Sequence, residues 1–300
     1  MVHPSPPKPP AILKNLGFER GSYKGWSYLA KSEEGIPKLI DRASVLLSST
    51  SPNPIEACDS CHDITLPGNT RCLMYVSSIK GTLLGLLTPT SFQPFKRAFE
   101  GSLVMKAMNH PVVEAYALIE RGGFLSRLET ILVLSVDSGY RNFPVQIPAL
   151  LDMPFRASNE VYYKIGKALG IIHNSRIIAG IESPNQILVR IDEGNVDVKI
   201  IAGKSYQTES VLSEQRECED LVGANFLFHH AIAPIQRMRL LTAYGRERKY
   251  TREQLKTRIA IVADMTRIRA LREWKVYPSD LPKKTSYLNL IRALDRHSEH

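Results

Sequence analysis

Short apolar runs separated by turns fill the chain between residues 71 and 138. The runs RCLMYVSS and TLLGLLT (82–88) flank the turn IKG, and this pattern predicts a β-hairpin. Apolar positions then recur at helical spacing from Pro94 to about Asn109, and proline is tolerated in the first turn of a helix. Two more strands are predicted at 112–120 and 129–137. This part of the chain is therefore predicted to be a small β-rich lobe with one helix.

The second half of the chain changes to helical periodicity. A helix is predicted from an N-cap at Ser158 or Asn159 to His173, because apolar residues recur there every three or four positions. Short strands at 186–191 and 197–202 flank the turn DEGN, and further helices follow. The order of elements indicates an α+β protein whose second, larger lobe is mainly helical.

The first 70 residues carry weaker signals. Residues 1–12 are rich in proline, which removes backbone donors, and we expect a partly disordered or polyproline-like arm there. Residues 36–47 have apolar positions at helical spacing. The stretch 48–70 that follows is rich in turn residues and predicts a loop.

Composition places the chain among globular proteins. Hydrophobic residues make up 43% of its 300 residues, which is enough for a sizeable core. No apolar run approaches the roughly 20 residues needed to cross a bilayer, and the start of the chain lacks the charged and then apolar order of a signal peptide. We therefore expect a cytoplasmic protein. Its four cysteines are expected to be reduced, because they are too few and too unevenly spaced for a disulfide framework.

Positive charge is concentrated near the C-terminus. Residues 237–275 contain twelve Lys or Arg and four acids, so this segment supplies +8 of the net charge of +9. Such a block either forms the solvated face of ordinary helices or binds an anionic partner. The candidates for anionic-surface binding are Arg267, Arg269, Arg272 and Lys275. Nucleic acid is the less favoured anionic partner, because no aromatic stacking platform accompanies the segment.

The segment LGIIHNSRIIAGIESPNQILV, residues 169–189, resembles the catalytic loop of the protein-kinase-like fold. In detail it is similar to that of the lipopolysaccharide kinase family of the Kdo/WaaP type. In that family a helix ends in a Leu-x-x-x-His phrase, and a loop of the form His-x-Asp-x-x-x-x-Asn-Ile-Leu follows. His173, Pro184 and Leu188 keep this framework without a gap. The resemblance extends from about Pro94 to Tyr244 and implies a two-lobed kinase-like domain. Because the substrate of that family is a phosphorylated glycolipid at the cytoplasmic membrane face, the resemblance also makes anionic lipid the preferred partner of the basic segment.

This resemblance divides the chain into three parts. Residues 1–65 form an N-terminal extension, residues 66–245 form the kinase-like domain, and residues 246–300 form a basic helical segment. Within the domain, the small lobe is expected to end near residue 138. The resemblance also implies structural roles for His173 and for Asp220, an acid that would order the backbone of the catalytic loop.

The residues that would perform kinase chemistry are replaced. Ala179 stands at the position of the loop His, Ile181 at that of the catalytic Asp, and Gln186 at that of the Asn that holds a magnesium ion. In the next motif Ile201 replaces the metal-binding Asp, and only Gly203 remains. Isoleucine offers no lone pair to a magnesium ion or a substrate hydroxyl, so phosphoryl transfer by the usual route is expected to fail.

The small lobe agrees with this interpretation. The nearest Lys to the TLLGLLT run is Lys80, in the preceding turn, and no glycine-rich loop precedes it. Glu100, in the following helix, matches the acid that would pair with the missing Lys, but a solvated surface carboxylate is the favoured explanation, since one Glu in a mixed helix carries little information. An atypical kinase remains an alternative, in which Glu182 and Asn185 take over after a one-residue register shift and ATP and magnesium are cofactors.

The stretch ACDSCH offers a second, weaker motif. It matches the Cys-x-x-Cys-His phrase of haem attachment, but that attachment occurs outside the cytoplasm. Cys58, Cys61, His62 and Cys72 are also four soft ligands suited to zinc, although their spacing is uneven. The alternative is a reduced pair of loop cysteines, and we assign no metal or cofactor.

Three functions remain open from the sequence. The favoured one is an inactive kinase-fold protein, a pseudokinase, that binds or scaffolds partners near anionic ligands, peripheral to the inner membrane face. The second is an active atypical kinase that phosphorylates a glycolipid or small molecule. The third is a basic protein that binds nucleic acid.

Overall fold

The computed structural model describes residues 9–49, 60–79, 94–122, 128–153, 155–192, 195–225 and 234–274. These residues form two units. One contains the described residues up to Ser138 together with Ala202–Ser205, and the other contains Gly139–Ile201 and the described residues from Tyr206 onward. The first is built on a β-sheet and the second mainly on helices, which confirms the predicted α+β class. The order of elements is also the one implied by the resemblance to the kinase-like fold.

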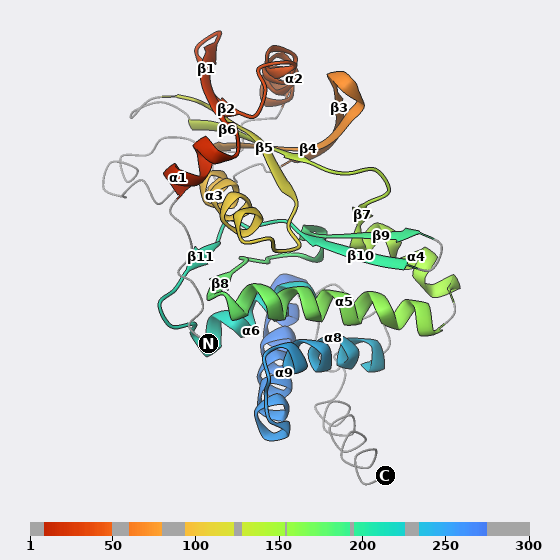
Figure 1. Ribbon diagram of the computed structural model, residues 1–300. Helices are drawn as coiled ribbons and strands as arrows, with labels where there is room; N and C mark the ends of the chain where they lie inside the picture. The colour runs from red at the N-terminus through yellow and green to blue at the C-terminus, as the bar shows by residue number, and fades with distance from the viewer. Residues whose placement is uncertain are drawn as a thin grey trace. The chain divides into compact units, whose positions relative to one another are not determined.

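A six-stranded antiparallel sheet forms the β-rich unit, in the order β1-β2-β5-β6-β4-β3 (Figure 1). Its strands are β1 (Glu19–Tyr23), β2 (Trp26–Ala30), β3 (Ser60–Leu66), β4 (Thr70–Ile79), β5 (Glu114–Arg121) and β6 (Leu128–Ser135). The described helices of this unit are α1 (Pro9–Asn15), α2 (Ile36–Ser49) and α3 (Pro94–Ala107).

Helices α2 and α3 cover opposite faces of this sheet (Figure 1). On the first face, Ile36 and Ile40 of α2 join a buried cluster with Trp26 and Met74 from the strands. On the second face, the ring of Phe95 on α3 packs edge-on against Tyr75 of β4, with 6.3 Å between the ring centroids. Each large apolar side chain buried in this way contributes about 1.5–3 kcal/mol.

The sheet begins earlier in the chain than the sequence interpretation placed it. β1 and β2 are joined by the turn residues Lys24 and Gly25, whose φ angles are +48° and +77°. Two successive positive φ angles are typical of the hairpin turns that match strand twist. Because β2 pairs with β5, these strands belong to the β-rich unit, and residues 19–30 are not part of a separate extension.

The loop predicted at 48–70 is wrong over its second part, where β3 forms. Its side chains alternate between exposed positions such as Cys61 and Asp63 and buried positions such as Ile64 and Leu66. This period-two pattern is the signature of a half-buried strand. The turn residues around it concealed the pattern.

The helical unit contains five described helices and several short strands. The helices are α4 (Phe143–Asp152), α5 (Phe155–Asn174), α6 (Glu214–Asn225), α8 (Pro234–Glu247) and α9 (Arg252–Trp274). The strands are β7 (Arg141–Asn142), β8 (Ile177–Ile178), β9 (Ile187–Asp192), β10 (Asn195–Ile200) and β11 (Gln207–Thr208), with a 3₁₀ turn, η4 (Pro184–Gln186), before β9.

A close approach of two helices organises this unit. Gly166 of α5 lies against α8, and a Cβ atom at this glycine would come within 2.0 Å of the Leu240 carbonyl oxygen. Glycine is therefore required for the backbones to pack at this distance. The contact fixes the last turns of α5, from which the loop after Asn174 begins.

Most predicted elements are confirmed. The helix at 94–109, the strands near 112–120 and 129–137 and the hairpin at 187–200 occur as α3, β5, β6 and the β9–β10 pair. α5 ends where predicted but starts at Phe155, before the proposed caps. The predicted strand at 82–88 lies outside the described residues. None of the described helices is both long and apolar enough to cross a membrane.

Candidate functional site

A loop of five residues, 179–183, connects β8 to η4 in the helical unit and carries the kinase-like sequence. It leaves the end of α5 through β8, which pairs with β11, and returns through η4 into β9. Gly180 within it has a φ angle of +72°, a conformation that glycine adopts without strain. Two side chains from outside the loop, Asp220 and Gln186, hold its backbone.

Asp220 of α6 is the first of these side chains. Its carboxylate accepts hydrogen bonds from the backbone N–H groups of Ala179 and Ile181, each at 2.7 Å. It also accepts one from Nε2 of His173, at 3.1 Å. Asp220 is 2% exposed, so its charge is compensated by donors and not by water. The carboxylate thus holds both ends of the Ala179–Ile181 backbone and the end of α5.

His173 and Tyr244 extend this buried group. In the neutral imidazole, donation from Nε2 to Asp220 leaves Nδ1 as an acceptor for the Tyr244 hydroxyl, 2.8 Å away. Burial raises the pKa of Tyr244, so its hydroxyl keeps its proton and donates. Hydrogen bonds from Tyr244 to His173 and from His173 to Asp220 therefore link helices α8, α5 and α6.

Helix α6 also touches the loop backbone directly. A Cβ atom at Gly223 would lie 1.7 Å from the Ile181 carbonyl oxygen, a distance that no side chain tolerates. Gly223 is one turn after Asp220, so the same face of α6 supplies the carboxylate and the space for the loop. On this side, the loop is held both by hydrogen bonds to the Asp220 carboxylate and by close packing against Gly223.

Gln186 is the second organising side chain, and its amide is fully used. Its Oε1 accepts from the backbone N–H groups of Glu182 and Ser183, at 2.7 and 3.1 Å. Its Nε2 lies 3.2 Å from the carbonyl oxygen of Gly180 and 3.4 Å from that of Ile201, and donates to both. An oxygen that already accepts two N–H groups is not available to a magnesium ion. Gln186 therefore stands at the position of a metal ligand, but its side chain stabilises the loop backbone through hydrogen bonds.

The positions of the catalytic carboxylates are apolar and buried. Ile181 and Ile201 are each 3% exposed, and Ala179 is fully buried. Ala202 and Gly203, which follow Ile201, are also buried. With no carboxylate at these positions, the described residues offer no base for a substrate hydroxyl and no magnesium ligand there.

The acid and the amide that would perform the chemistry in an atypical kinase are exposed to solvent. Glu182 and Asn185 are both exposed, whereas Ile187 and Val189 of β9 are fully buried. A one-residue shift would exchange the faces of β9 and take Ile187 and Val189 out of the buried positions that fit them, on a strand where Leu188 of the other face is buried as well. Arg269 of α9 donates to the Glu182 carbonyl oxygen at 2.7 Å, so the basic helix contacts this loop.

A second buried carboxylate of α6, that of Glu217, was not identified from the sequence. It is 2% exposed, and its carboxylate accepts hydrogen bonds from Arg248 and, at 2.7 Å, from the Tyr250 hydroxyl. Arg258 of α9 forms an ion pair with it at 3.3 Å. Glu217 lies three residues before Asp220, on the same side of α6, and this spacing was the available signal.

Part of the basic segment is therefore structural. Arg248 and Arg258 are bound to Glu217, and Arg237 is buried. Arg267 is exposed on α9. The Arg272 side chain and Lys275 lie outside the described part of the structure. The segment does not present all of its positive charge to a partner.

The β-rich unit shows no phosphate-binding lysine in its described strands. None of β1 to β6 contains Lys, and Arg71, in β4, is paired with Asp63 of β3. Lys80 lies outside the described residues. Glu100 is half-buried on α3. Lys204, which follows Gly203, packs over the Phe95 ring, and burial lowers its pKa.

The proposed zinc ligands do not converge. Cys61 lies opposite Tyr75 in the sheet and Cys72 lies opposite Ile64, so the two thiols project from opposite faces. His62 shares the face of Cys72. Burial raises the pKa of Cys72 to about 12, which keeps the thiol protonated and unsuited to a metal. Cys58 lies outside the described residues, among which no group of metal-binding side chains is found.

Comparisons with known proteins give similarity of structure only. No family model and no curated protein sequence matches the chain. One similar solved structure is WaaP in complex with acyl carrier protein, at 14% identity and a TM-score of 0.48, covering 80% of this chain and 97% of that one. Another is glucosamine kinase in complex with glucosamine, ADP and inorganic phosphate, at 9% identity and a TM-score of 0.41, covering 91% of this chain and 96% of that one.

Proposed function

We propose that this chain is a kinase-fold protein that does not transfer phosphate by the usual route and acts as a binding or scaffolding module. The observation that carries the proposal is the state of the 179–183 loop. Its backbone is held by Asp220 and Gln186 through direct hydrogen bonds, with no position left for a metal ion on Gln186. A loop ordered in this way needs no nucleotide or magnesium to keep its shape.

The chemistry supports the same proposal. Phosphoryl transfer depends on positioning and on neutralisation of charge by magnesium, and two carboxylates and a lysine normally supply these functions. Ile181 and Ile201 replace the carboxylates, and the described strands of the sheet have no lysine. If the fold serves to present a binding surface, the framework residues are still needed although the catalytic residues are replaced.

We expect no magnesium-dependent stabilisation of the purified protein by ATP. A nucleotide present at about 100 times its dissociation constant would add about 2.7 kcal/mol to the free energy of unfolding, which a melting experiment detects easily. The melting temperature is measured with ATP and magnesium, with ATP and a chelator, and with magnesium alone. A rise that requires ATP and magnesium together contradicts the proposal.

The same purified protein is used to test the alternative that the chain is an active atypical kinase. If Glu182 and Asn185 performed the chemistry, phosphate release from ATP would be detectable and would disappear in Glu182→Gln and Asn185→Ala variants. Both side chains are exposed, so these substitutions leave the core intact. Activity that is abolished by these variants, with the melting temperature unchanged, would establish the alternative.

We further propose that anionic lipid is the partner and that the protein acts in the cytoplasm, peripheral to the membrane. The support is the +8 charge of residues 237–275, in which Arg267 of α9 is exposed. Each basic side chain that reaches an anionic surface contributes about 1 kcal/mol and is screened by salt. Attachment is therefore expected to be reversible and sensitive to salt.

We expect binding to anionic vesicles to exceed binding to duplex DNA at one ionic strength. A variant with Arg267, Arg272 and Lys275 changed to Gln should bind vesicles at least about tenfold more weakly, because three contributions of about 1 kcal/mol are removed. Arg269 is left in place because it bonds to the loop. The matched control changes three other exposed basic residues to Gln, Arg239 and Arg246 on α8 and Lys249 just after it. Tighter binding to DNA, or equal losses in both variants, would contradict the assignment to the C-terminal segment.

A further inference from the structure

A row of polar side chains crosses the sheet of the β-rich unit at right angles to its strands. The strand register aligns Ser22 with Ser27, Ser27 with Glu120, Glu120 with Thr130, and Thr130 with Ser77. Directly opposed residues in an antiparallel sheet project from the same face. The five side chains therefore lie on one face, spread over five neighbouring strands.

The surroundings of this row are apolar. The next row on the same face aligns Leu29, Leu118, Leu132 and Tyr75. Ser77 is 2% exposed and Thr130 is 4% exposed, so the inner end of the polar row is not a solvated surface. Polar groups at such depth are normally paired with a partner.

Two atoms of the row lack a partner. Within the described part of the protein, neither Oγ of Ser77 nor Oε1 of Glu120 has a hydrogen-bond partner, although both atoms are buried. Ser102, a buried serine on α3, in contrast donates to the Val113 carbonyl oxygen. A buried polar atom left unpaired costs about 1–3 kcal/mol. The row is thus incomplete in the isolated chain.

The charge around the row is nearly balanced. Burial raises the pKa of the Glu120 carboxyl, and the positive charge of Lys96 on α3 opposes this rise. No ion pair joins Lys96 and Glu120 among the described contacts. An acceptor-rich row beside a compensating cation suits a neutral molecule with several hydrogen-bond donors better than a free cation.

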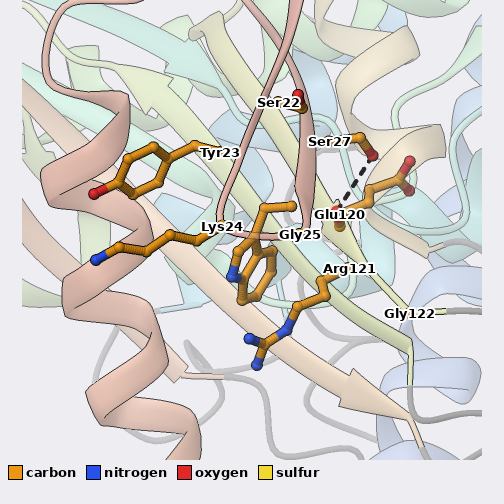
Figure 2. A pocket seen from close by; sticks show the side chains of 9 residues that line it. Ser22, Tyr23, Lys24, Gly25, Ser27, Glu120, Arg121 and Gly122 are labelled. Carbon is orange, nitrogen blue, oxygen red and sulfur yellow. Dashed lines mark hydrogen bonds between the residues drawn. The ribbon is translucent and has the colours of Figure 1, made fainter.

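A hollow gives access to the outer end of the row. It has a volume of about 330 Å³, at the lower end of the range for small-molecule sites, and lies at the tip of the β1–β2 hairpin and the end of β5. Figure 2 shows the Ser27 and Glu120 side chains on one side of the sheet, and those of Lys24 and Arg121 on the other. Ser27 donates to the Glu120 backbone carbonyl at 3.3 Å, which leaves the Glu120 carboxylate unoccupied by this contact.

We infer that the hollow and the polar row bind a small polyhydroxylated molecule, a sugar or polyol, whose hydroxyl groups donate to Glu120 and to the serine and threonine hydroxyls. A vicinal pair of hydroxyls can donate to both oxygens of one carboxylate. Ser22 and Ser27 lie at the hollow, and Thr130 and Ser77 continue the row inward. This site is separate from the 179–183 loop and does not depend on the proposed function.

The test uses myo-inositol and sorbitol as probes of the full-length protein. Saturation-transfer NMR should show contact with at least one probe in the millimolar range, and Glu120→Gln should weaken binding about tenfold or more. Ser27→Ala is a second variant at the hollow. The matched control is Glu19→Gln, an exposed position on β1 that does not line the hollow, and it should bind as the original protein does.

Stability separates a binding role of Glu120 from a structural one. Because burial raises its pKa, the ionised carboxylate disfavours folding at neutral pH, and Glu120→Gln should keep or raise the melting temperature without probe. Loss of binding together with unchanged or higher stability supports the site. The inference is overturned by absence of contact with both probes, by binding that survives Glu120→Gln, or by stronger binding of ethylammonium than of either polyol.

Discussion

Replacement of Asp220 by alanine is expected to lower the free energy of unfolding by about 3–5 kcal/mol, because three buried donors lose their acceptor at once. The donors are the backbone N–H groups of Ala179 and Ile181 and Nε2 of His173. Each buried donor left unpaired costs about 1–3 kcal/mol. The effect should also be visible locally, as faster hydrogen exchange at the amides of Ala179 and Ile181.

The measurement is urea denaturation followed by a probe in the helical unit, combined with hydrogen exchange. Asp152→Ala is a suitable control, because Asp152 is an exposed acid at the end of α4. It should change the free energy of unfolding by less than about 0.5 kcal/mol. A loss below about 1 kcal/mol for Asp220→Ala, with exchange unchanged, would show that the loop is held by other contacts.

Replacement of Glu217 by alanine is expected to be as damaging, by about 3–5 kcal/mol, for an electrostatic reason. The carboxylate is buried and lies between Arg248 and Arg258, with Tyr250 as a further donor. Its removal leaves Arg248 with a hydrogen bond to Asn174 but without its carboxylate partner, while Arg258 keeps only the ion pair with Glu214, a side chain that is 56% exposed. The cost of an uncompensated buried charge exceeds the value of the original ion pairs.

Glu219 provides the control on the same helix. It pairs with Arg216 at 3.0 Å but is 35% exposed, and a surface pair of this kind contributes at most about 1 kcal/mol. Glu219→Ala should therefore have a small effect, which shrinks further in salt. If Glu217→Ala and Glu219→Ala lower the free energy of unfolding equally, the Glu217 cluster is not the structural centre that its contacts indicate.

The fold could be predicted where one periodicity dominates a stretch of sequence. The helix from Pro94 and the pair β5 and β6 follow directly from apolar spacing. β1 and β2 were missed because ERGSY contains a single hydrophobic residue, WSYLA is only five residues long, and the turn Lys24–Gly25 is a weaker signal than Asn–Gly. Here pairing with β5, a contact distant in sequence, decides the structure.

The site could be predicted only in part. The resemblance over residues 169–189 located the loop and His173, and the later phrase ECEDLVGANFLF pointed to Asp220, which lies within hydrogen-bond distance of His173. It did not indicate what Gln186 does, because the amide bonds with backbone groups and backbone groups have no sequence signature. The partners of Glu217 lie 31 to 41 residues away, and a single sequence contains no sign of such pairing.

The Glu217 cluster has a consequence for how the chain folds during synthesis. Asn174 at the end of α5 bonds with Arg248, a residue 74 positions later, and Arg258 closes the same cluster from α9. Contacts so distant in sequence carry a large loop-closure entropy and form late. Domains made on the ribosome begin to fold as soon as their own residues emerge. The helical unit therefore cannot complete its folding until α9 has left the exit tunnel. In contrast, every described strand of the six-stranded sheet has been synthesised once the chain reaches Ser135, long before α9 is made.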